Sequence, residues 1–289
     1  MNDAPRIDWR TLTAAERESE VSPSSCIGGD YQPLIEAYAT RSAEAREAAT
    51  ALGGRWIEGR YGSAAARRIE LCLPPAYDGR AAALLVYFHG GYWQELSAAR
   101  SLFAAADCIR RGIAFAAVDH TLAPLARVGE IVGECRSATA WLLANAPALG
   151  VDERRVVVAG SSAGAQLAAM VAIEQRQRLR GAVLVSGVYE LEALIGTSVN
   201  EALDLDAGEA RHSSPALLPL QGFPPALVAW GDVETDLFKQ QSRDFAAALE
   251  LAGTRCECLE VPARNHFDVI VDLADDGSGL GQAAFALFD

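Results

Sequence analysis

The chain has 289 residues, of which 51% are hydrophobic and 22% charged, and its 25 Lys and Arg against 38 Asp and Glu give a net charge of −13. This composition excludes a disordered chain and disfavours nucleic acid or an anionic membrane surface as the partner. The polar N-terminus predicts no secretory signal, and no apolar run approaches the roughly 20 residues that a membrane helix needs. Six scattered cysteines are typical of reduced thiols, so we expect a cytoplasmic protein that acts on a small molecule.

The N-terminal part of the chain is predicted to be helical. Residues 1–50 form a polar segment whose clearest helix covers residues 34–46. Two strand candidates follow at residues 55–61 and 68–73, separated by a short turn with Gly62. Their imperfect alternation of apolar and polar side chains indicates an antiparallel pair at the edge of a larger sheet.

From residue 82 onward, apolar strands alternate with helices. The run at residues 84–88 is continuously apolar, which is typical of a parallel strand buried on both faces. The expected strands are 84–88, 113–118, 156–159, 182–185, 226–230 and 256–261, with helices at 97–111, at 129–146, from the turn after the strand at 156–159 to about 177, at 238–252 and at the C-terminus. This order predicts one α/β domain over residues 1–289, a doubly wound, mostly parallel sheet with helices on both faces. Residues 189–220 lack a matching strand and are predicted to be a small cap or insertion over the strands' carboxyl ends.

The strongest local motif is Gly160-Ser161-Ser162-Ala163-Gly164, which fits the G-x-S-x-G pattern of a nucleophile elbow. It lies between the β-branched strand at 156–159 and an Ala-rich helix. Glycines two residues either side of a serine remove collisions at a sharp strand-to-helix turn. The hydroxyl of Ser162 is therefore expected to stand at a helix N-terminus, where the helix dipole favours a developing anion.

A serine nucleophile needs a base within hydrogen-bond reach. In open α/β sheets the site lies outside the carboxyl ends of the strands, so the loops that follow strands hold the candidates. The chain has four histidines: His89, His120, His212 and His266. His266 follows the last expected strand and is the preferred general base.

The acid that orients this base is expected in the loop after the strand at 226–230. Asp232, Glu234 and Asp236 are all present there. Glu234 is preferred because it stands three residues after Gly231, and because the chain order serine, acid, histidine is then kept. Asp232 stays open as the alternative, and Asp236 is expected to cap the helix that follows.

The loop that begins at His89 supplies the remaining requirement, which is an oxyanion hole. Glycines let backbone amides approach a reacting carbonyl oxygen closely. We expect the amides of Gly90, Gly91 and Ala163 to form that hole. Tyr92 and Trp93 follow directly, and this aromatic pair could stack an aryl leaving group or simply pack in the core.

Together these residues resemble the α/β-hydrolase superfamily, and more narrowly its arylformamidase (kynurenine formamidase) branch. The resemblance runs from about residue 55 to the end. The segments that carry it are His-Gly-Gly-Tyr-Trp-Gln at 89–94, the elbow helix at 162–170, Ser-Gly-Val-Tyr-Glu-Leu at 186–191, Ser-Ser-Pro at 213–215, Gln-Ser-Arg at 241–243 and Asn-His-Phe at 265–267. One departure is Ser161, where relatives often carry histidine.

The resemblance implies hydrolysis of N-formyl-L-kynurenine to kynurenine and formate. In that reaction Ser162 would be the nucleophile, Glu234 the acid and His266 the base, while Tyr92 and Trp93 would flank the acyl or aryl pocket. A carboxylesterase of small acyl esters with the same triad is the alternative, and a binding protein without catalysis is disfavoured because all three triad residue types are present. No H-E-x-x-H or clustered histidines occur, so no metal or other cofactor is expected, and a homodimer stays open.

Overall fold

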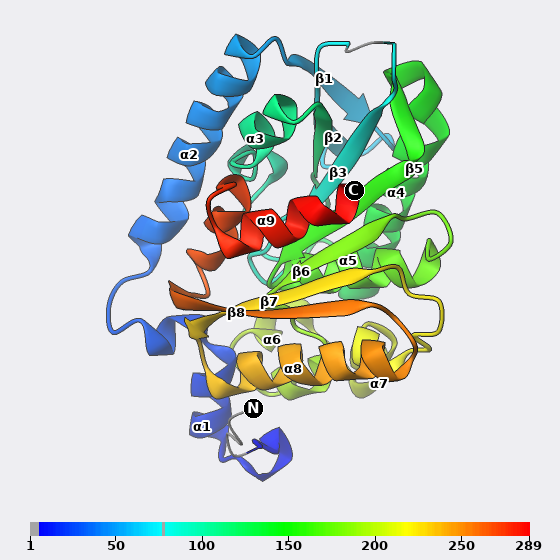
Figure 1. Ribbon diagram of the computed structural model, residues 1–289. Helices are drawn as coiled ribbons and strands as arrows, with labels where there is room; N and C mark the ends of the chain where they lie inside the picture. The colour runs from blue at the N-terminus through cyan, green and yellow to red at the C-terminus, as the bar shows by residue number, and fades with distance from the viewer. Residues whose placement is uncertain (1–5, 77–78) are drawn as a thin grey trace.

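The computed structural model of the protein describes residues 6–76 and 79–289, so the first five residues of the expected N-terminal helical segment lie outside the described part (Figure 1). An eight-stranded sheet crosses the molecule in the order β1-β2-β4-β3-β5-β6-β7-β8. β1 pairs antiparallel with β2, and β2 with β4, while the other neighbours are parallel. The strands are β1 Arg55–Arg60, β2 Arg68–Leu73, β3 Ala82–Phe88, β4 Ile113–Val118, β5 Val151–Ser161, β6 Gly181–Val185, β7 Ala226–Val233 and β8 Cys256–Asn265.

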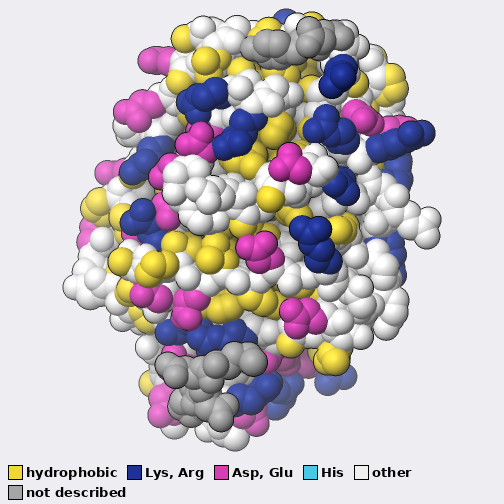
Figure 2. Space-filling model, in the orientation of Figure 1, with side chains coloured by type: hydrophobic (Ala, Val, Ile, Leu, Met, Phe, Trp, Pro, Cys, Tyr) yellow, Lys and Arg dark blue, Asp and Glu magenta, His cyan; other side chains and the backbone are white. Residues whose placement is uncertain are grey.

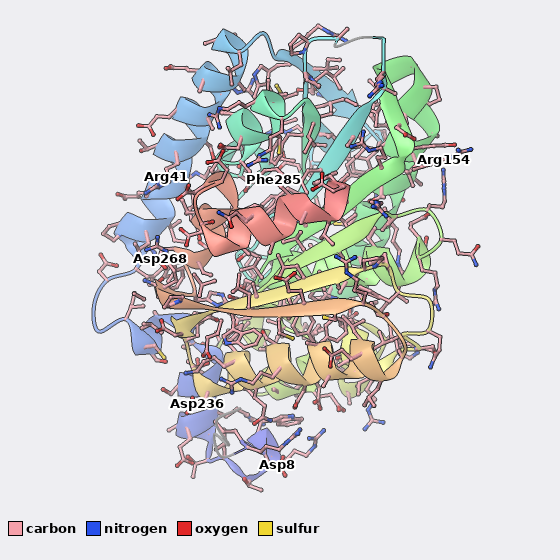
Figure 3. The ribbon with its side chains drawn as sticks, viewed as in Figure 1. Asp8, Arg41, Arg154, Asp236, Asp268 and Phe285 are labelled. Carbon is pink, nitrogen blue, oxygen red and sulfur yellow. The ribbon has the colours of Figure 1, made fainter. Side chains whose placement is uncertain are left out.

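Helices cover both faces of the sheet. The alternation of side chains along each strand divides the core in two, since Leu84 and Val86 of β3 face one hydrophobic cluster and Leu85 faces the other. The first cluster includes side chains of α4, α5 and α8, and the second includes those of α2, α3 and α9; Phe285 of α9, labelled in Figure 3, is buried in the second. The helices are α1 Ala14–Val21, α2 Gln32–Ala51, α3 Ala105–Arg110, α4 Val128–Leu149, α5 Ala163–Glu174, α6 Asn200–Leu203, α7 Ala207–His212, α8 Asp236–Leu251 and α9 Gly279–Phe285.

The predicted architecture is confirmed, and two local expectations are wrong. The helix expected at 97–111 is broken into a 3₁₀ turn at Ala98–Arg100 and the short α3. Side chains from elsewhere stabilise this arrangement: Asp119 accepts the Ala98 amide at the start of the turn at 2.6 Å, and Ser42 accepts the Leu102 amide within the break at 3.0 Å. The second error concerns the start of α8. Thr235, whose hydroxyl accepts the Phe238 amide, is the N-cap, and Asp236 is the first helical residue.

The segment at 189–220 carries no strand among its described residues and instead contains short helical turns, α6 and α7. Basic and acidic side chains are interspersed on the face shown in Figure 2. No helix within residues 6–76 or 79–289 is long and apolar enough to cross a membrane.

The packing of α2 against the chain between Ala98 and Arg110 provides a stability prediction. Ser42 of α2 is fully buried, and its hydroxyl accepts the Leu102 amide at 3.0 Å. Ser42→Ala should lower the free energy of unfolding by about 1–3 kcal/mol, because a buried amide then loses its acceptor. Urea denaturation measures this change. Ser137→Ala is the matched control: its hydroxyl bonds the Gly133 carbonyl on an exposed face of α4, so the change should stay within about 0.5 kcal/mol. Equal effects of the two variants would contradict the assignment.

Candidate active site

Ser162 stands alone between the end of β5 and the start of α5. Its backbone angles, φ 57° and ψ −124°, lie in a region that side-chain-bearing residues rarely adopt, so the turn is strained. Its amide donates to the Val185 carbonyl at 2.8 Å, which ties the turn to β6. Glycine is required on both sides: a Cβ at Gly160 would overlap the Gly164 carbonyl, and a Cβ at Gly164 would overlap the Phe88 carbonyl.

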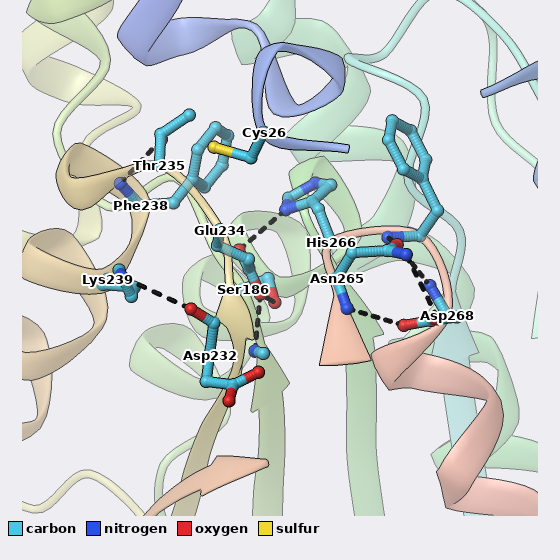
Figure 4. Close-up of polar contacts among 12 residues, drawn as sticks. Cys26, Ser186, Asp232, Glu234, Thr235, Phe238, Lys239, Asn265, His266 and Asp268 are labelled. Carbon is cyan, nitrogen blue, oxygen red and sulfur yellow. Dashed lines mark hydrogen bonds and ion pairs between the residues drawn. The ribbon is translucent and has the colours of Figure 1, made fainter. Parts of the chain in front are cut away.

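The loop after β7 and the end of β8 meet through Glu234 and His266. One oxygen of the Glu234 carboxylate lies 2.9 Å from Nδ1 of His266 (Figure 4). The other oxygen accepts the Ser186 hydroxyl and the Gly231 amide, both at 2.6 Å. The Glu234 side chain is fully buried, so the three hydrogen bonds hold the carboxylate in one orientation toward the imidazole.

The other two acidic residues of this loop lie elsewhere. Asp232 is exposed, and its carboxylate points away from His266 in Figure 4. Its backbone carbonyl accepts the Lys239 ammonium at 3.4 Å. Asp236 is also exposed and pairs with Lys239 at 3.4 Å. Of the three acidic residues considered from the sequence, Glu234 is therefore the one that contacts the histidine.

Ser186 is a residue of this site that the sequence analysis did not single out. It follows β6, is fully buried and has φ 50°, so the chain turns sharply there and directs the hydroxyl to Glu234. Its position after a parallel strand was a usable signal, because polar residues at strand ends were the criterion for the other candidates.

A cavity of about 200 Å³ brings Ser162 and His266 together, since both line its wall. Within the described residues no hydrogen bond joins the Ser162 hydroxyl to the imidazole. Hydrogen bonds between a nucleophile and its base are often long in unliganded enzymes. The lack of this bond is therefore compatible with proton transfer when a substrate is bound.

The loop after β3 lies directly against Ser162. A Cβ at Gly90 would stand 3.3 Å from the Ser162 Cβ and 2.9 Å from the Ser161 carbonyl oxygen. Gly91 has φ 90°, and its carbonyl accepts the Gln94 amide at 2.8 Å, so the chain turns sharply at this glycine. Ala163 begins α5, and the first amides of a helix have no partner within it. Gly90 and Gly91 therefore line the cavity with Ser162, and Ala163 follows Ser162 directly in the chain. Their role as an oxyanion hole stays a prediction.

Of the two aromatic residues expected to flank the pocket, only Tyr92 lines the cavity. The expectation for Trp93 is wrong. Its side chain is fully buried in the core, and its indole nitrogen donates to the Gln166 side chain at 3.1 Å. Positive φ values of 48° at Tyr92 and 60° at Trp93 turn the backbone so that the second ring packs behind the loop.

The wall opposite the strand ends comes from residues 18–38, which we call the N-terminal cover. In Figure 1 this segment runs from α1 to α2 past the ends of β7 and β8. Its residues in the wall are Val21, Ser22, Pro23, Ser24, Tyr31, Ile35 and Tyr38. From the segment at 189–220, Val199 alone contributes to the described wall, so the cavity is covered chiefly by a part of the chain that the sequence analysis did not connect with the site.

Hydrogen bonds attach the N-terminal cover beside each candidate functional loop. Tyr92 donates to the Val21 carbonyl at 2.5 Å, and the Thr235 hydroxyl donates to the Glu20 carbonyl at 2.7 Å. The Tyr38 hydroxyl donates to the carbonyl of Phe267. These bonds lie in the loop after β3, next to Glu234 and next to His266 respectively, so the cover and the three loops are held in one arrangement.

Behind the oxyanion loop, His89 and His120 stack with ring centroids 4.3 Å apart. Burial lowers the pKa of His89 to about 4 and that of His120 to about 3. Each Nδ1 lies near a backbone carbonyl, of Gly90 at 3.0 Å and of Thr121 at 3.1 Å. Both imidazoles are therefore neutral near pH 7, and neither lines the cavity with Ser162.

Metal ligation finds no support in the described part of the chain, where no group of three His, Cys, Asp or Glu side chains could hold an ion. The acidic turn near Gly277 is used internally. Asp272 accepts the Arg264 guanidinium at 2.9 Å, and Asp275 accepts the Gly277 amide at 2.8 Å.

Comparison with known proteins places this geometry in context. The family model described as alpha/beta hydrolase fold matches residues 85–269. The kynurenine formamidase of Danio rerio is 29% identical over 281 residues, which cover 93% of this chain and 94% of that protein. Esterase LipC of Mycobacterium tuberculosis is 24% identical over 255 residues, covering 78% of this chain and 62% of that protein. The crystal structure of a provisionally assigned thioesterase from Silicibacter sp. TM1040 is similar with a TM-score of 0.77 and 26% identity, covering 90% of this chain and 95% of that chain.

The buried histidine pair predicts how stability depends on pH. His120 binds a proton below about pH 6.5 when unfolded but only near pH 3 when folded, so stability falls as the pH drops below about 6.5. Between pH 7 and pH 5 this histidine should account for about 2 kcal/mol of the loss. His120→Gln removes the titration, so its free energy of unfolding should fall about 2 kcal/mol less than that of the wild type over the same range. Denaturant unfolding at the two pH values measures this difference; an equal fall in both proteins would refute it. His89, Asp119 and Glu134 lie near His120 and are unchanged in the variant.

Proposed function

The chain belongs to the alpha/beta hydrolase fold family and is a hydrolase, and we propose that it cleaves the formyl amide of an aromatic amine, as in the conversion of N-formylkynurenine to kynurenine and formate. The observation that carries this proposal is the Glu234–His266 hydrogen bond beside Ser162, in a cavity with aromatic walls. The likeness to a kynurenine formamidase over nearly the whole chain supports the choice of a formamide.

The proposed reaction begins with attack of the Ser162 hydroxyl oxygen on the formyl carbon. His266 accepts the hydroxyl proton, and the negative charge of Glu234 stabilises the imidazolium that forms. The carbonyl oxygen becomes an oxyanion that accepts hydrogen bonds from the amides of the loop at Gly90 and of Ala163; one such donor is worth roughly 2.7–4 kcal/mol.

The tetrahedral intermediate then collapses with cleavage of the carbon–nitrogen bond. His266 returns its proton to the departing aromatic amine, which leaves a formyl ester on Ser162. A water molecule, deprotonated by His266, attacks this ester, and formate departs as the serine regains its proton. Each step needs only the serine, the imidazole and the backbone donors, so no cofactor enters the scheme.

Aromatic side chains in the cavity support an aryl substrate. Tyr31 and Phe267 stack with ring centroids 5.2 Å apart, and Phe103 also lines the wall. Offset stacking on such rings contributes about 0.5–1.5 kcal/mol beyond the area buried.

Hydrolysis of small acyl esters is the second candidate. The likeness to an esterase favours it, and the same serine, base and oxyanion donors serve both reactions. The two candidates differ in the leaving group, because an amine needs protonation by His266 before it departs, whereas a phenolate does not.

The proposed triad predicts a clear ranking of variants. Ser162→Ala should lower kcat/KM by at least about 10³-fold, and Glu234→Gln by about 10²–10⁴-fold, because the imidazole loses its charged partner. Asp232→Asn is the matched control and should stay within about twofold, since Asp232 is exposed and its carboxylate points away from His266. Steady-state kinetics on one formamide or ester substrate measure all three. A larger loss at Asp232 than at Glu234 would show that the acid is assigned wrongly, and full activity of Ser162→Ala would refute the mechanism.

Substrate preference separates the two candidate functions. We expect kcat/KM for N-formylkynurenine to exceed that for p-nitrophenyl acetate and p-nitrophenyl butyrate, measured with the same preparation and with Ser162→Ala as the background control. A kcat/KM for the formamide far below the values for the esters would contradict formamidase activity and favour the esterase.

A further inference from the structure

The cavity beside Ser162 has an uneven distribution of charge. Its described wall contains one carboxylate, that of Glu95, and no lysine or arginine. The remaining ionisable or polar side chains in the wall are serine and tyrosine hydroxyls and the imidazole of His266. A substrate with a carboxylate would therefore meet no cationic partner there.

Glu95 is free to contact a ligand, because it is exposed and no hydrogen bond or ion pair reaches its carboxylate from residues 6–76 or 79–289. Glu18 and Glu20 of the N-terminal cover, which do not line the cavity, already have hydrogen-bond partners. Glu18 accepts the Ser198 amide at 2.9 Å, and Glu20 accepts the Leu237 amide at 2.8 Å. Lys239 lies on α8, paired with Asp236, and does not reach the wall.

The side chain of Glu95 packs against the proposed oxyanion loop. A Cβ at Gly91 would stand 2.8 Å from the Cγ of Glu95, so the stem of this glutamate lies over the glycine. A negative charge at that place repels the oxyanion that the loop is proposed to bind. A positive group on the bound substrate would offset this repulsion.

The aromatic wall favours the same kind of ligand. Tyr31, Tyr38, Tyr92, Phe103 and Phe267 all line the cavity. The faces of aromatic rings attract cations, and desolvation in a partly closed cavity strengthens that attraction. The same faces offer no hydrogen-bond donor to an anion.

We infer that the cavity selects aromatic substrates whose ring carries a cationic or neutral group rather than a carboxylate, and that Glu95 at its mouth is the residue that favours the cation. This inference rests on the proposed function, since it concerns the leaving-group side of the same site. It narrows the aryl formamides to those that present an ammonium or an uncharged group to Glu95. N-formylkynurenine, which is a zwitterion, meets this condition when its ammonium faces Glu95 and its carboxylate faces solvent.

Three para-substituted formanilides test the inference. They carry a trimethylammonium group, the isosteric neutral tert-butyl group, or a carboxylate. Their dissociation constants are measured by calorimetry on Ser162→Ala, which keeps the cavity and cannot turn the compounds over. The trimethylammonium compound should bind most tightly and the carboxylate least tightly. Adding Glu95→Gln should reduce the preference for the cation over the neutral isostere by about two- to fivefold, the range measured for exposed ion pairs.

Two further variants separate a local contact from the field of the whole chain. Glu257 is exposed near the amino end of β8, whereas the cavity lies at the carboxyl ends of the strands. Glu257→Gln therefore removes the same charge far from the cavity. It should leave the cation preference unchanged. Glu95→Lys should reverse the order, with the carboxylate compound bound more tightly than the cation. High salt should narrow the differences, because the carboxylate is exposed.

The outcomes are distinct. The inference is overturned if Glu95→Gln leaves the cation preference unchanged, or if Glu95→Gln and Glu257→Gln reduce it equally. It is also overturned if protein with Glu95 binds the carboxylate compound most tightly, or if none of the three compounds binds. Turnover of the same formanilides by the unmodified protein is measured separately. Binding with the expected order but without turnover would refute the proposed function and leave the charge selection standing.

Discussion

The site depends on one buried carboxylate, that of Glu234. Its two oxygens join three strand ends: Ser186 follows β6, Gly231 belongs to β7, and His266 follows β8. A fully buried carboxylate is stable only where hydrogen bonds replace its lost hydration, so these three partners have to be in place together. The parallel register of the strands puts them there, and the remaining loops of the site are arranged around the imidazole that Glu234 orients.

Most of the architecture could be predicted because a parallel strand buried on both faces has an unmistakable composition. The strand expected at 113–118 has those same limits in the structure, and the edge pair at 55–60 and 68–73 is antiparallel as expected. The loops with candidate chemistry followed from the same reasoning, because carboxyl ends of parallel strands share an edge. The pattern of a strand therefore predicts the residue at which the loop after it begins.

The direction of a side chain within a loop could not be predicted in the same way. Tyr92 and Trp93 are neighbours of similar character, and only the left-handed backbone at both residues places one ring in the cavity and the other in the core. The break at Ala98–Arg100 and the role of Ser186 likewise depend on partners distant in the sequence. The N-terminal cover is the largest such case, since periodicity within residues 18–38 contains no information about β7 or β8.

That cover also has a consequence for how the protein is made. The contact between Tyr38 and Phe267 spans 229 positions of the chain, and the one between Thr235 and Glu20 spans 215. During synthesis the N-terminal cover leaves the ribosome more than 200 residues before His266. The apolar side chains of the N-terminal cover therefore stay exposed until β7 and β8 have been synthesised. Contacts between residues so far apart in sequence also form slowly, because closing a long loop costs conformational entropy. A nascent chain that ends before residue 266 contains Ser162 but lacks His266, so the proposed site can form only after β8 and the residue that follows it have been synthesised.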